Sequence, residues 1–299
     1  MSTENEIKNV SEKDESCCAP SCCGGEKSTV TAISINEHHK SDDELKNIVK
    51  EKYGEIARNS TSCCGGGKAS DYSMIGDEYK HIDGYVADAD LHLGCGVPTE
   101  FAGIKRGDTI VDLGSGAGND VFVARALAGN EGKVIGVDMT QEMIYKANMN
   151  NDKVGYNNVD FRLGEIENLP IADNIADVII SNCVLNLVPN KTKAFAEIFR
   201  VLKPGAHFCV SDIVIKGTLP AGLKNDAEMY AGCVAGAIQQ DDYLNIIKEQ
   251  GFINVEIKQA KETLLPAEVL KKYLSDEEII NMKKTFTGIY SITVVGYKP

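Results

Sequence analysis

A glycine-rich turn between an apolar strand and a helix constrains the fold of this chain more than any other feature of its sequence. The turn reads DLGSGAG over residues 112–118 and follows the run TIV at residues 109–111. Residues 119–127 then carry apolar side chains at the spacing of one helical face. A strand, a glycine loop and a helix in this order predict an α/β fold with a ligand-binding loop after the first strand.

The spacing of the glycines argues against a nicotinamide cofactor. Asn119 stands where the dinucleotide fingerprint has its third glycine. The turn better fits a nucleoside without a pyrophosphate, such as S-adenosylmethionine, whose amino-acid tail and ribose would lie against the glycines and the helix N-terminus. The residues of the turn that we expect to contact this cofactor are Asp112, Gly114, Ser115, Gly116 and Gly118.

Acidic residues after the following predicted strands support this interpretation. Asp138 ends the second strand and lies 20 residues after Gly118, the offset at which a carboxylate accepts hydrogen bonds from ribose hydroxyls. After the third strand, Glu165 or its backbone amide would face the adenine, with Ile166 beside it. Two plainer interpretations stay open: the turn as an ordinary tight loop, and Glu165 as a solvated loop acid. The predicted cofactor-binding set is completed by Met139 and Asn182.

The charge balance excludes several partners. The 299 residues include 31 basic and 44 acidic side chains, which gives a formal net charge of −13. This charge argues against nucleic acid and anionic membrane surfaces. No apolar run is long enough to span a membrane, and residues 1–15 lack the apolar region of a signal peptide. We therefore expect a soluble, cytoplasmic protein.

Ten cysteines need an explanation in such a protein. Because cytosolic thiols are held reduced, a structural disulfide framework is not expected. Three adjacent pairs lie in low-complexity sequence, whereas four single cysteines lie in or beside globular sequence. The pairs are Cys17 with Cys18, Cys22 with Cys23, and Cys63 with Cys64, and the single residues are Cys95, Cys183, Cys209 and Cys233.

Composition and periodicity divide the chain into four parts. Ser41 and Glu44 have the spacing of a capping box, which predicts a helix from there to about residue 57. The parts are a disordered, cysteine-rich tail (1–40), a helical cap segment with the Cys63 and Cys64 loop (41–106), the cofactor-binding core (107–220), and the substrate region with the last strands (221–299).

From residue 107 onward, predicted strands alternate with predicted helices, which favours a doubly wound, seven-stranded, mostly parallel sheet. Ligands bind such sheets at the carboxyl ends of the strands, so Cys183, just after the fourth strand, would lie where a transferred methyl group emerges. Residues 258–284 are placed only by exclusion, as a partial lid or outer helical layer. The strands are expected at 109–113, 133–137, 159–163, 176–181, 207–215, 252–257 and 289–297, and the helices at 119–127, 143–149, 192–202, 223–237, 241–250 and 266–274.

Three cysteine segments make a family resemblance specific. They read GCG at residues 94–96, SNCVLNLV at 181–188 and GCVAGA at 232–237. In this order they resemble the arsenite methyltransferases, a branch of the class I S-adenosylmethionine-dependent superfamily, over roughly residues 42–299. The resemblance implies a Rossmann-like, doubly wound seven-stranded sheet with a C-terminal α+β region.

The resemblance also implies roles for the cysteines. Cys95, Cys183 and Cys233 match the residues that hold trivalent arsenic, and either Cys63 or Cys64 matches a further redox-active cysteine. Arsenite is soft and prefers thiolate ligands, which leave it a lone pair as nucleophile. The substrate would be arsenite or its thiol conjugates. The resemblance further implies a protein disulfide that thioredoxin or glutathione reopens, and a monomer.

Alternatives remain at this point. Cys209 fits a small apolar core residue, and the four N-terminal cysteines fit either capture of soft metalloids or monovalent copper, or a flexible tail. Tyr79 and Tyr85 fit either a cofactor wall or the core, and no histidine is assigned a catalytic role. The chain as a whole could also be a C- or O-methyltransferase of quinone-like acceptors, or a thiol-rich protein that sequesters metalloids.

Overall fold

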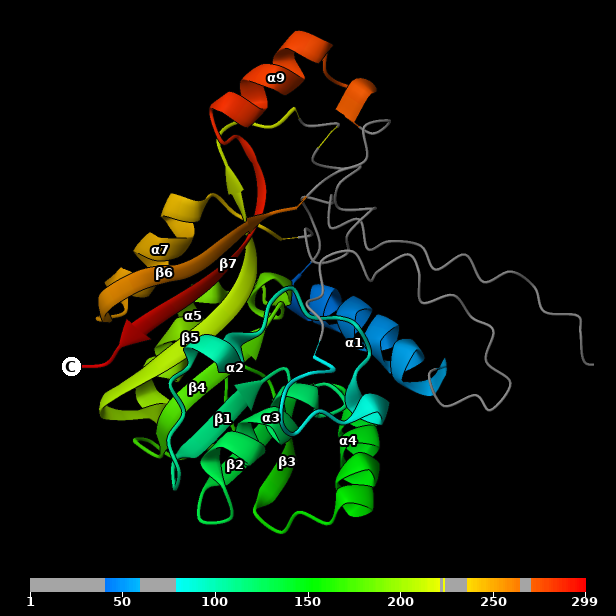
Figure 1. Ribbon diagram of the computed structural model, residues 1–299, viewed down its shortest axis with the longest axis vertical. Helices are drawn as coiled ribbons and strands as arrows, with labels where there is room; N and C mark the ends of the chain where they lie inside the picture. Colours follow the sequence, from blue (N-terminus) through cyan, green and yellow to red (C-terminus); the bar gives the residue numbers. More distant parts are fainter. Residues whose placement is uncertain (1–40, 60–78, 221–222, 224–235, 264–269) are drawn as a thin grey trace, which may run out of the picture. The chain divides into compact units, whose positions relative to one another are not determined.

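A computed structural model of the chain describes residues 41–59, 79–220, 223, 236–263 and 270–299 (Figure 1). The predicted tail at 1–40 lies outside the described residues, as do residues 224–235 of the helix expected at 223–237 and residues 266–269 of the helix expected at 266–274. Seven cysteines also lie outside them, namely Cys17, Cys18, Cys22, Cys23, Cys63, Cys64 and Cys233.

The described chain forms one seven-stranded sheet in the order β3-β2-β1-β4-β5-β7-β6. The pairs from β3 to β5 are parallel, and β7 runs antiparallel to both β5 and β6. The mostly parallel, doubly wound sheet expected from the sequence is therefore confirmed. The strands are β1 (Thr109–Leu113), β2 (Lys133–Asp138), β3 (Val159–Leu163), β4 (Ala176–Asn182), β5 (Leu202–Lys216), β6 (Ile253–Glu262) and β7 (Gly288–Tyr297).

Helices cover both faces of the sheet. On one face, Phe195 and Ile198 of α5 and Tyr243 of α7 pack in one apolar cluster with strand residues. On the other face, Val121 and Phe122 of α3 do the same. None of the helices in the described ranges is long and apolar enough to cross a lipid bilayer. The helices are α1 (Asp42–Asn59), α2 (Pro98–Phe101), α3 (Asn119–Ala128), α4 (Gln141–Val154), α5 (Lys191–Val201), α7 (Gln240–Glu249) and α9 (Asp276–Lys284), with short 3-10 turns η2 (Ala87–Ala89) and η3 (Leu185–Leu187).

The predicted start of α1 is confirmed. The Ser41 N–H donates to Glu44 Oε2 at 2.8 Å, and the Glu44 N–H donates to Ser41 Oγ at 3.3 Å. This reciprocal pair satisfies backbone donors that a helix N-terminus leaves without partners inside the helix.

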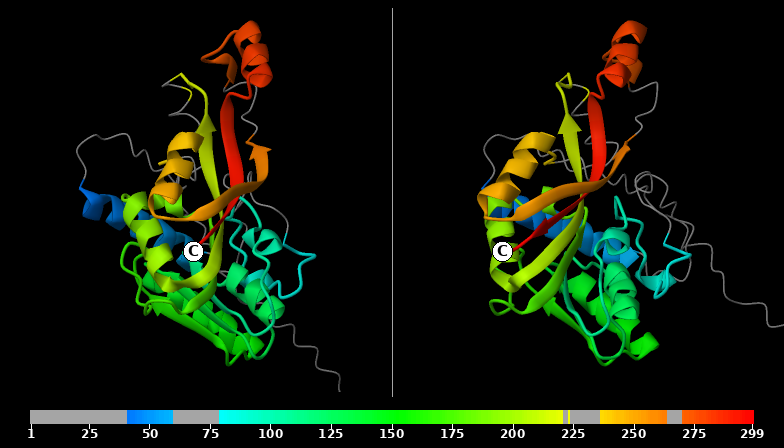
Figure 2. Two further views of the ribbon diagram at one scale, coloured as in Figure 1. Left: turned by 90° about the vertical axis from the view of Figure 1, so that its left-hand side faces the viewer. Right: turned by 60° about the vertical axis from the view of Figure 1, so that its left-hand side comes forward.

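Two boundary predictions were wrong. Leu202 begins β5 instead of ending the preceding helix, since it pairs with Ala176 of β4. Residues 258–262 continue β6, because pairing with β7 satisfies their backbone groups, and the described outer helix, α9, begins only at Asp276. Figure 2 shows α9 beyond the ends of β5 and β7, away from the rest of the sheet.

The glycine turn after β1 depends on the absence of side chains. Gly114, Gly116 and Gly118 all have positive φ angles, of 70°, 52° and 101°. A Cβ on Gly118 would lie 2.9 Å from ring carbons of Phe122 and Phe161. The backbone therefore turns from β1 into α3 through conformations that other L-residues rarely adopt.

We expect Gly118→Ala to lower the free energy of unfolding by about 3 kcal/mol, because backbone strain and crowding add. Gly155→Ala, after α4, is the matched control, since Gly155 also has a positive φ of 71° but no neighbour within 4 Å of its Cβ position. That control should lose about 1 kcal/mol. Urea unfolding followed by circular dichroism measures both, and equal losses would contradict the close approach at Gly118.

Candidate active site

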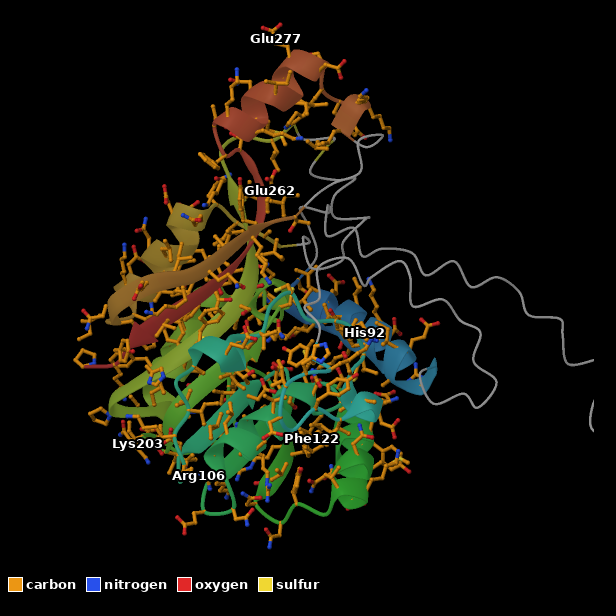
Figure 3. The ribbon with its side chains drawn as sticks, viewed as in Figure 1. His92, Arg106, Phe122, Lys203, Glu262 and Glu277 are labelled. Carbon is orange, nitrogen blue, oxygen red and sulfur yellow. The ribbon has the colours of Figure 1, made fainter. Side chains whose placement is uncertain are left out.

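A cleft of about 1160 Å³, open to solvent, lies at the carboxyl ends of the strands. Residues after β1, β2, β3 and β4 line it, together with α1 and the loop around His92. Figure 3 shows His92 beside α1. Gly118, which caps α3, is not among the lining residues. The other predicted cofactor-binding residues all line the cleft, namely Asp112, Gly114, Ser115, Gly116, Asp138, Met139, Glu165, Ile166 and Asn182.

Three aspartates that line the cleft, Asp112, Asp120 and Asp138, make it acidic. Burial raises the pKa of Asp112 well above its usual value, and the nearby Asp120 and Asp138 carboxyls raise it further. Burial also raises the pKa of Asp120 to about 6 and the pKa of Asp138 above its ordinary range. Carboxyls gathered in this way favour a cationic ligand, because a positive charge repays the desolvation of the carboxylate form.

The Asp138 carboxylate is held in place by the backbone. Oδ2 accepts from the Gly116 N–H at 3.0 Å, and Oδ1 accepts from the Thr140 N–H at 2.8 Å. Nearby, Ser115 Oγ and Asn119 Oδ1 are buried and have no hydrogen-bond partner among the described residues. Buried polar atoms are normally paired. A polar ligand with hydroxyl and amino groups, such as S-adenosylmethionine, therefore fits this wall of the cleft.

The Asn182 side chain links the cleft to the loop that carries Cys95. Its Oδ1 accepts from the N–H groups of Cys95 at 3.0 Å and Gly96 at 3.3 Å. Its Nδ2 lies 2.7 Å from the Tyr79 hydroxyl and 3.1 Å from Asp120 Oδ2. The Tyr79 hydroxyl in turn donates to Asp120 Oδ1 at 2.9 Å. One side chain thus positions both a cleft acid and a predicted arsenic ligand.

Cys95 and Cys183, both proposed as arsenic ligands by the family resemblance, lie in one apolar cluster. Both are buried, and Cys183 lines the cleft with a φ of 61°, an uncommon conformation for a residue with a Cβ. The Cys183 N–H donates to the Ser211 carbonyl at 2.7 Å, and Ser291 Oγ donates to the Cys95 carbonyl at 2.5 Å. The two cysteines share an apolar cluster with Ile213, Ile215, Ala237 and Ile289.

The glycines on either side of Cys95 permit close packing. A Cβ on Gly94 would lie 2.6 Å from Asn182 Nδ2, and a Cβ on Gly96 would lie 2.6 Å from Ser211 Oγ. The loop can approach the ends of β4 and β5 only because both positions lack a side chain.

Cys209 is a core residue, as the sequence analysis expected. It is fully buried in the cluster on the α3 face, and its thiol donates to the Pro98 carbonyl at 3.2 Å. Burial raises its pKa to about 12. It is therefore not a thiolate at neutral pH.

Helix α1 closes over the cleft through ion pairs that the sequence did not reveal. Lys46 Nζ lies 2.5 Å from Glu167 Oε2 and 2.9 Å from Glu165 Oε2, and Lys50 Nζ lies 3.1 Å from Glu165 Oε1. The hydrogen bond from Lys46 holds the pKa of Glu165 below its usual value. Glu165 lines the cleft as predicted, but both of its carboxylate oxygens are engaged by α1. A contact of the Glu165 carboxylate with adenine would have to share these oxygens with the two lysines.

Sequence reasoning also missed Asp120. Asp120 lies in the first turn of α3, where an acid is ordinarily explained by the helix dipole. Tyr79 proves to be both buried and part of the cleft wall, whereas Tyr85 packs beside it and donates to Asp90. Only the tertiary structure could have found Asp120, because the partners of its carboxyl come from positions 79 and 182.

The fold, the glycine turn and the acidic cleft define a class I S-adenosylmethionine-dependent methyltransferase. A family model described as a methyltransferase domain matches residues 104–271. An arsenite methyltransferase of Halobacterium salinarum is 40% identical over 264 residues, which cover 82% of this chain and 68% of that protein. A second, from Aquipseudomonas alcaligenes, is 31% identical over 242 residues, or 76% and 68% of the two chains. The chain therefore belongs to the arsenite methyltransferase family.

A solved structure agrees with this assignment. The crystal structure of CrArsM, an arsenic(III) S-adenosylmethionine methyltransferase from Chlamydomonas reinhardtii, matches with a TM-score of 0.58 at 34% sequence identity. The match covers 69% of this chain and 67% of that one.

We expect cofactor affinity to rise between pH 5 and 7, because Asp120 must be ionised to favour the cationic cofactor and its pKa is about 6. The rise should be about tenfold. In Asp120→Asn the affinity should be lower at pH 7 and should change less with pH, with the remaining change coming from Asp112 and Asp138. Calorimetric titration with S-adenosylmethionine measures this, with Asp177→Asn as control, since Asp177 pairs with Lys203 and does not line the cleft. An unchanged pH slope in Asp120→Asn would contradict the assignment.

The same residue predicts a change in stability with pH. Because the pKa of Asp120 is higher in the folded than in the unfolded protein, ionising it costs stability, which falls as pH rises from about 4 to about 6. In Asp120→Asn, the stability measured by urea unfolding should fall less over this pH range.

We also expect Lys46→Ala to speed cofactor dissociation by about tenfold or more, because it leaves the Glu167 carboxylate, only 5% exposed, without its α1 partner. Lys50→Ala is the control, since it breaks only the half-exposed pair with Glu165. Stopped-flow displacement of bound S-adenosylhomocysteine gives the rates. Equal rates in the two variants would show that the buried pair does not hold α1 on the cleft.

Proposed function

We propose that this methyltransferase moves the methyl group of S-adenosylmethionine to trivalent arsenic held by the thiolates of Cys95, Cys183 and Cys233. The observation that carries the proposal is the placement of two buried cysteines in one cluster at the cofactor cleft, with Cys183 in the wall of the cleft itself. A methyl acceptor bound there would lie at the carboxyl ends of the strands, where the cofactor binds.

The described residues that follow Cys233 support its place as the third ligand. Ala237 packs in the cluster of Cys95 and Cys183. Gly236 lies so close to the Asn186 carbonyl oxygen that a Cβ would lie only 2.2 Å from it. Because Cys233 precedes Ala237 by only four residues, its backbone is at most about 14 Å from that anchor. This short span supports the proposal that Cys233 supplies the third thiolate.

Arsenic would bind by exchanging its hydroxide ligands for cysteine thiolates, a reaction that does not change its oxidation state. Each As–OH of arsenous acid would react with one cysteine thiol, so that an As–S bond replaces the As–O bond and the thiol proton leaves with the hydroxide as water. Three such exchanges place arsenic among three soft sulfur ligands and leave its lone pair in place. That lone pair needs no general base, because the attacking atom carries no proton.

The bound cofactor supplies an electrophilic methyl group on a sulfonium, whose sulfur keeps the bonding electrons as a neutral thioether after transfer. The protein contributes the surroundings. Asp112 and Asp120 favour a cation in the cleft. The Asn182 amide holds the Cys95 loop against the wall of the cleft that contains these two aspartates. Positioning of donor and acceptor would supply most of the rate.

Methylation formally oxidises arsenic by two electrons, which must be returned before a further turnover. We propose that two cysteines supply them by forming a disulfide, with Cys63 or Cys64 pairing with Cys95. Thioredoxin or glutathione would reduce that disulfide by thiol exchange. Helix α1 ends at Asn59 and lines the cleft through Lys46, Val49 and Tyr53, so the Cys63 and Cys64 pair follows directly on an element of the site.

We expect Cys183→Ser to lose arsenite binding and arsenite-dependent formation of S-adenosylhomocysteine, while affinity for S-adenosylmethionine is kept, because a hydroxyl is a poor ligand for soft arsenic. The loss in turnover should be about 100-fold or more, as when a reacting group is removed. Cys209→Ser is the matched control and should retain activity, since this residue contacts only the core. Product is measured by liquid chromatography, and bound arsenic by elemental mass spectrometry.

Two other results would contradict the proposed function. Turnover with an organic acceptor, unaffected by Cys183→Ser, would favour a quinone-type methyltransferase. Tight arsenite binding by the unaltered protein without any consumption of S-adenosylmethionine would favour sequestration.

A further inference from the structure

A second cavity lies on the other side of the cysteine cluster. It holds about 1020 Å³ of space open to solvent and lies between α9 and the ends of β5, β6 and β7. Figure 3 shows Glu262, one of its lining residues, near α9 and well apart from His92 in the cofactor cleft. The described residues that line the two cavities have no member in common.

Two residues of this second cavity also belong to the cysteine cluster. Ile289 is buried among Cys95 and Cys183, and Leu219 is half-buried against the same cluster. Both line the second cavity. The cavity therefore reaches the apolar cluster that contains the two cysteines.

A buried hydroxyl in the cavity wall lacks a partner. Thr263 Oγ1 is buried and makes no hydrogen bond within the part of the chain that the structure describes. The Thr263 N–H donates to the Ile289 carbonyl at 2.8 Å, so the backbone of Thr263 is paired with a member of the cysteine cluster. An unsatisfied buried hydroxyl costs free energy that a hydrogen-bonding ligand would recover.

Helix α9 presents an apolar face to the cavity but buries no residue. Its N-terminus has a full capping box from Ser275 and Glu278, yet all of its residues are at least partly exposed. Ile279, Ile280 and Met282 line the cavity. The charged residues of the rim balance two against two, being Lys271 and Lys283 against Glu262 and Asp276. An apolar interior with a neutral rim suits an uncharged ligand.

We propose that this second cavity is the access route and first binding site for uncharged trivalent arsenicals on their way to the cysteines. Arsenous acid is uncharged at neutral pH and carries hydroxyls that can pair with Thr263 Oγ1. The proposal rests on the function proposed above. It also gives the cofactor and the arsenical separate entries, because none of the described residues that line the second cavity lines the cofactor cleft.

The first test asks whether arsenic enters while the cofactor cleft is filled. Protein saturated with S-adenosylhomocysteine is mixed with arsenite under a phosphine reductant, and bound arsenic is measured after rapid desalting. We expect uptake at the rate of the protein without S-adenosylhomocysteine. If S-adenosylhomocysteine blocks uptake, the access route is overturned. If the protein binds no arsenite in either state, the proposed function fails instead.

The second test narrows the cavity. Ile280, 53% exposed in the cavity wall, is replaced by Trp, and Ile253→Trp on β6, at a position 48% exposed and outside the cavity, is the matched control. The chain has no other tryptophan, so each indole also reports on its own surroundings. Ile280→Trp should slow binding of the bulky probe phenylarsine oxide by about tenfold relative to the control. Equal rates in the two variants would overturn the proposal.

The third test removes the hydroxyl. Thr263→Val should slow arsenite loading by about fivefold, the effect of one hydrogen bond, whereas Thr263→Ser should not. Affinity for S-adenosylmethionine should be the same in all variants, which shows that they are folded. Equal loading rates in the Val and Ser variants would contradict a role for this hydroxyl.

Discussion

The close approach of the Gly94–Gly96 loop to the end of β4 is the constraint on which the site depends. Asn182 Oδ1 accepts two backbone hydrogen bonds from this loop, while Nδ2 faces the Tyr79 hydroxyl and the Asp120 carboxylate. Neither flanking position has room for a Cβ. One amide thus holds a predicted arsenic ligand and an acid of the cleft in a fixed relation, and a buried network of this kind is rigid because its members satisfy one another.

The buried carboxyls of the cleft favour a cationic ligand, but they lower the folding stability of the protein when no ligand is bound. Asp112, Asp120 and Asp138 are buried together, and each has a pKa above its ordinary range. In a chain with a net charge of −13, these carboxyls are costly to ionise. A ligand with a sulfonium and an ammonium group relieves that cost, so binding and folding stability are linked. The ion pairs of Lys46 then close α1 over the acids.

The cysteine cluster lies between two cavities of different character. The cofactor cleft is acidic, whereas the second cavity has an apolar interior and a balanced rim. Because the two cavities are separate, the charged methyl donor and the uncharged arsenical can reach the thiols by different routes. The long β5 and β7 make this possible, because they extend past the cofactor end of the sheet and carry Ile215 and Ile289 into the cluster.

The sequence by itself determined the sheet, the cofactor loop and the capping box of α1, because each rests on local spacing. The family resemblance pointed to Cys95 and Cys183, and the tertiary structure places them in one cluster. Local patterns could not show that Leu202 belongs to β5, or that residues 258–262 extend β6, because strand ends are set by the neighbouring strand. They also could not find Asp120, Lys46 or Thr263 as parts of a site. The surroundings of these side chains are assembled from segments distant in the chain, and only the tertiary structure decides which buried polar groups are paired and which are left for a ligand.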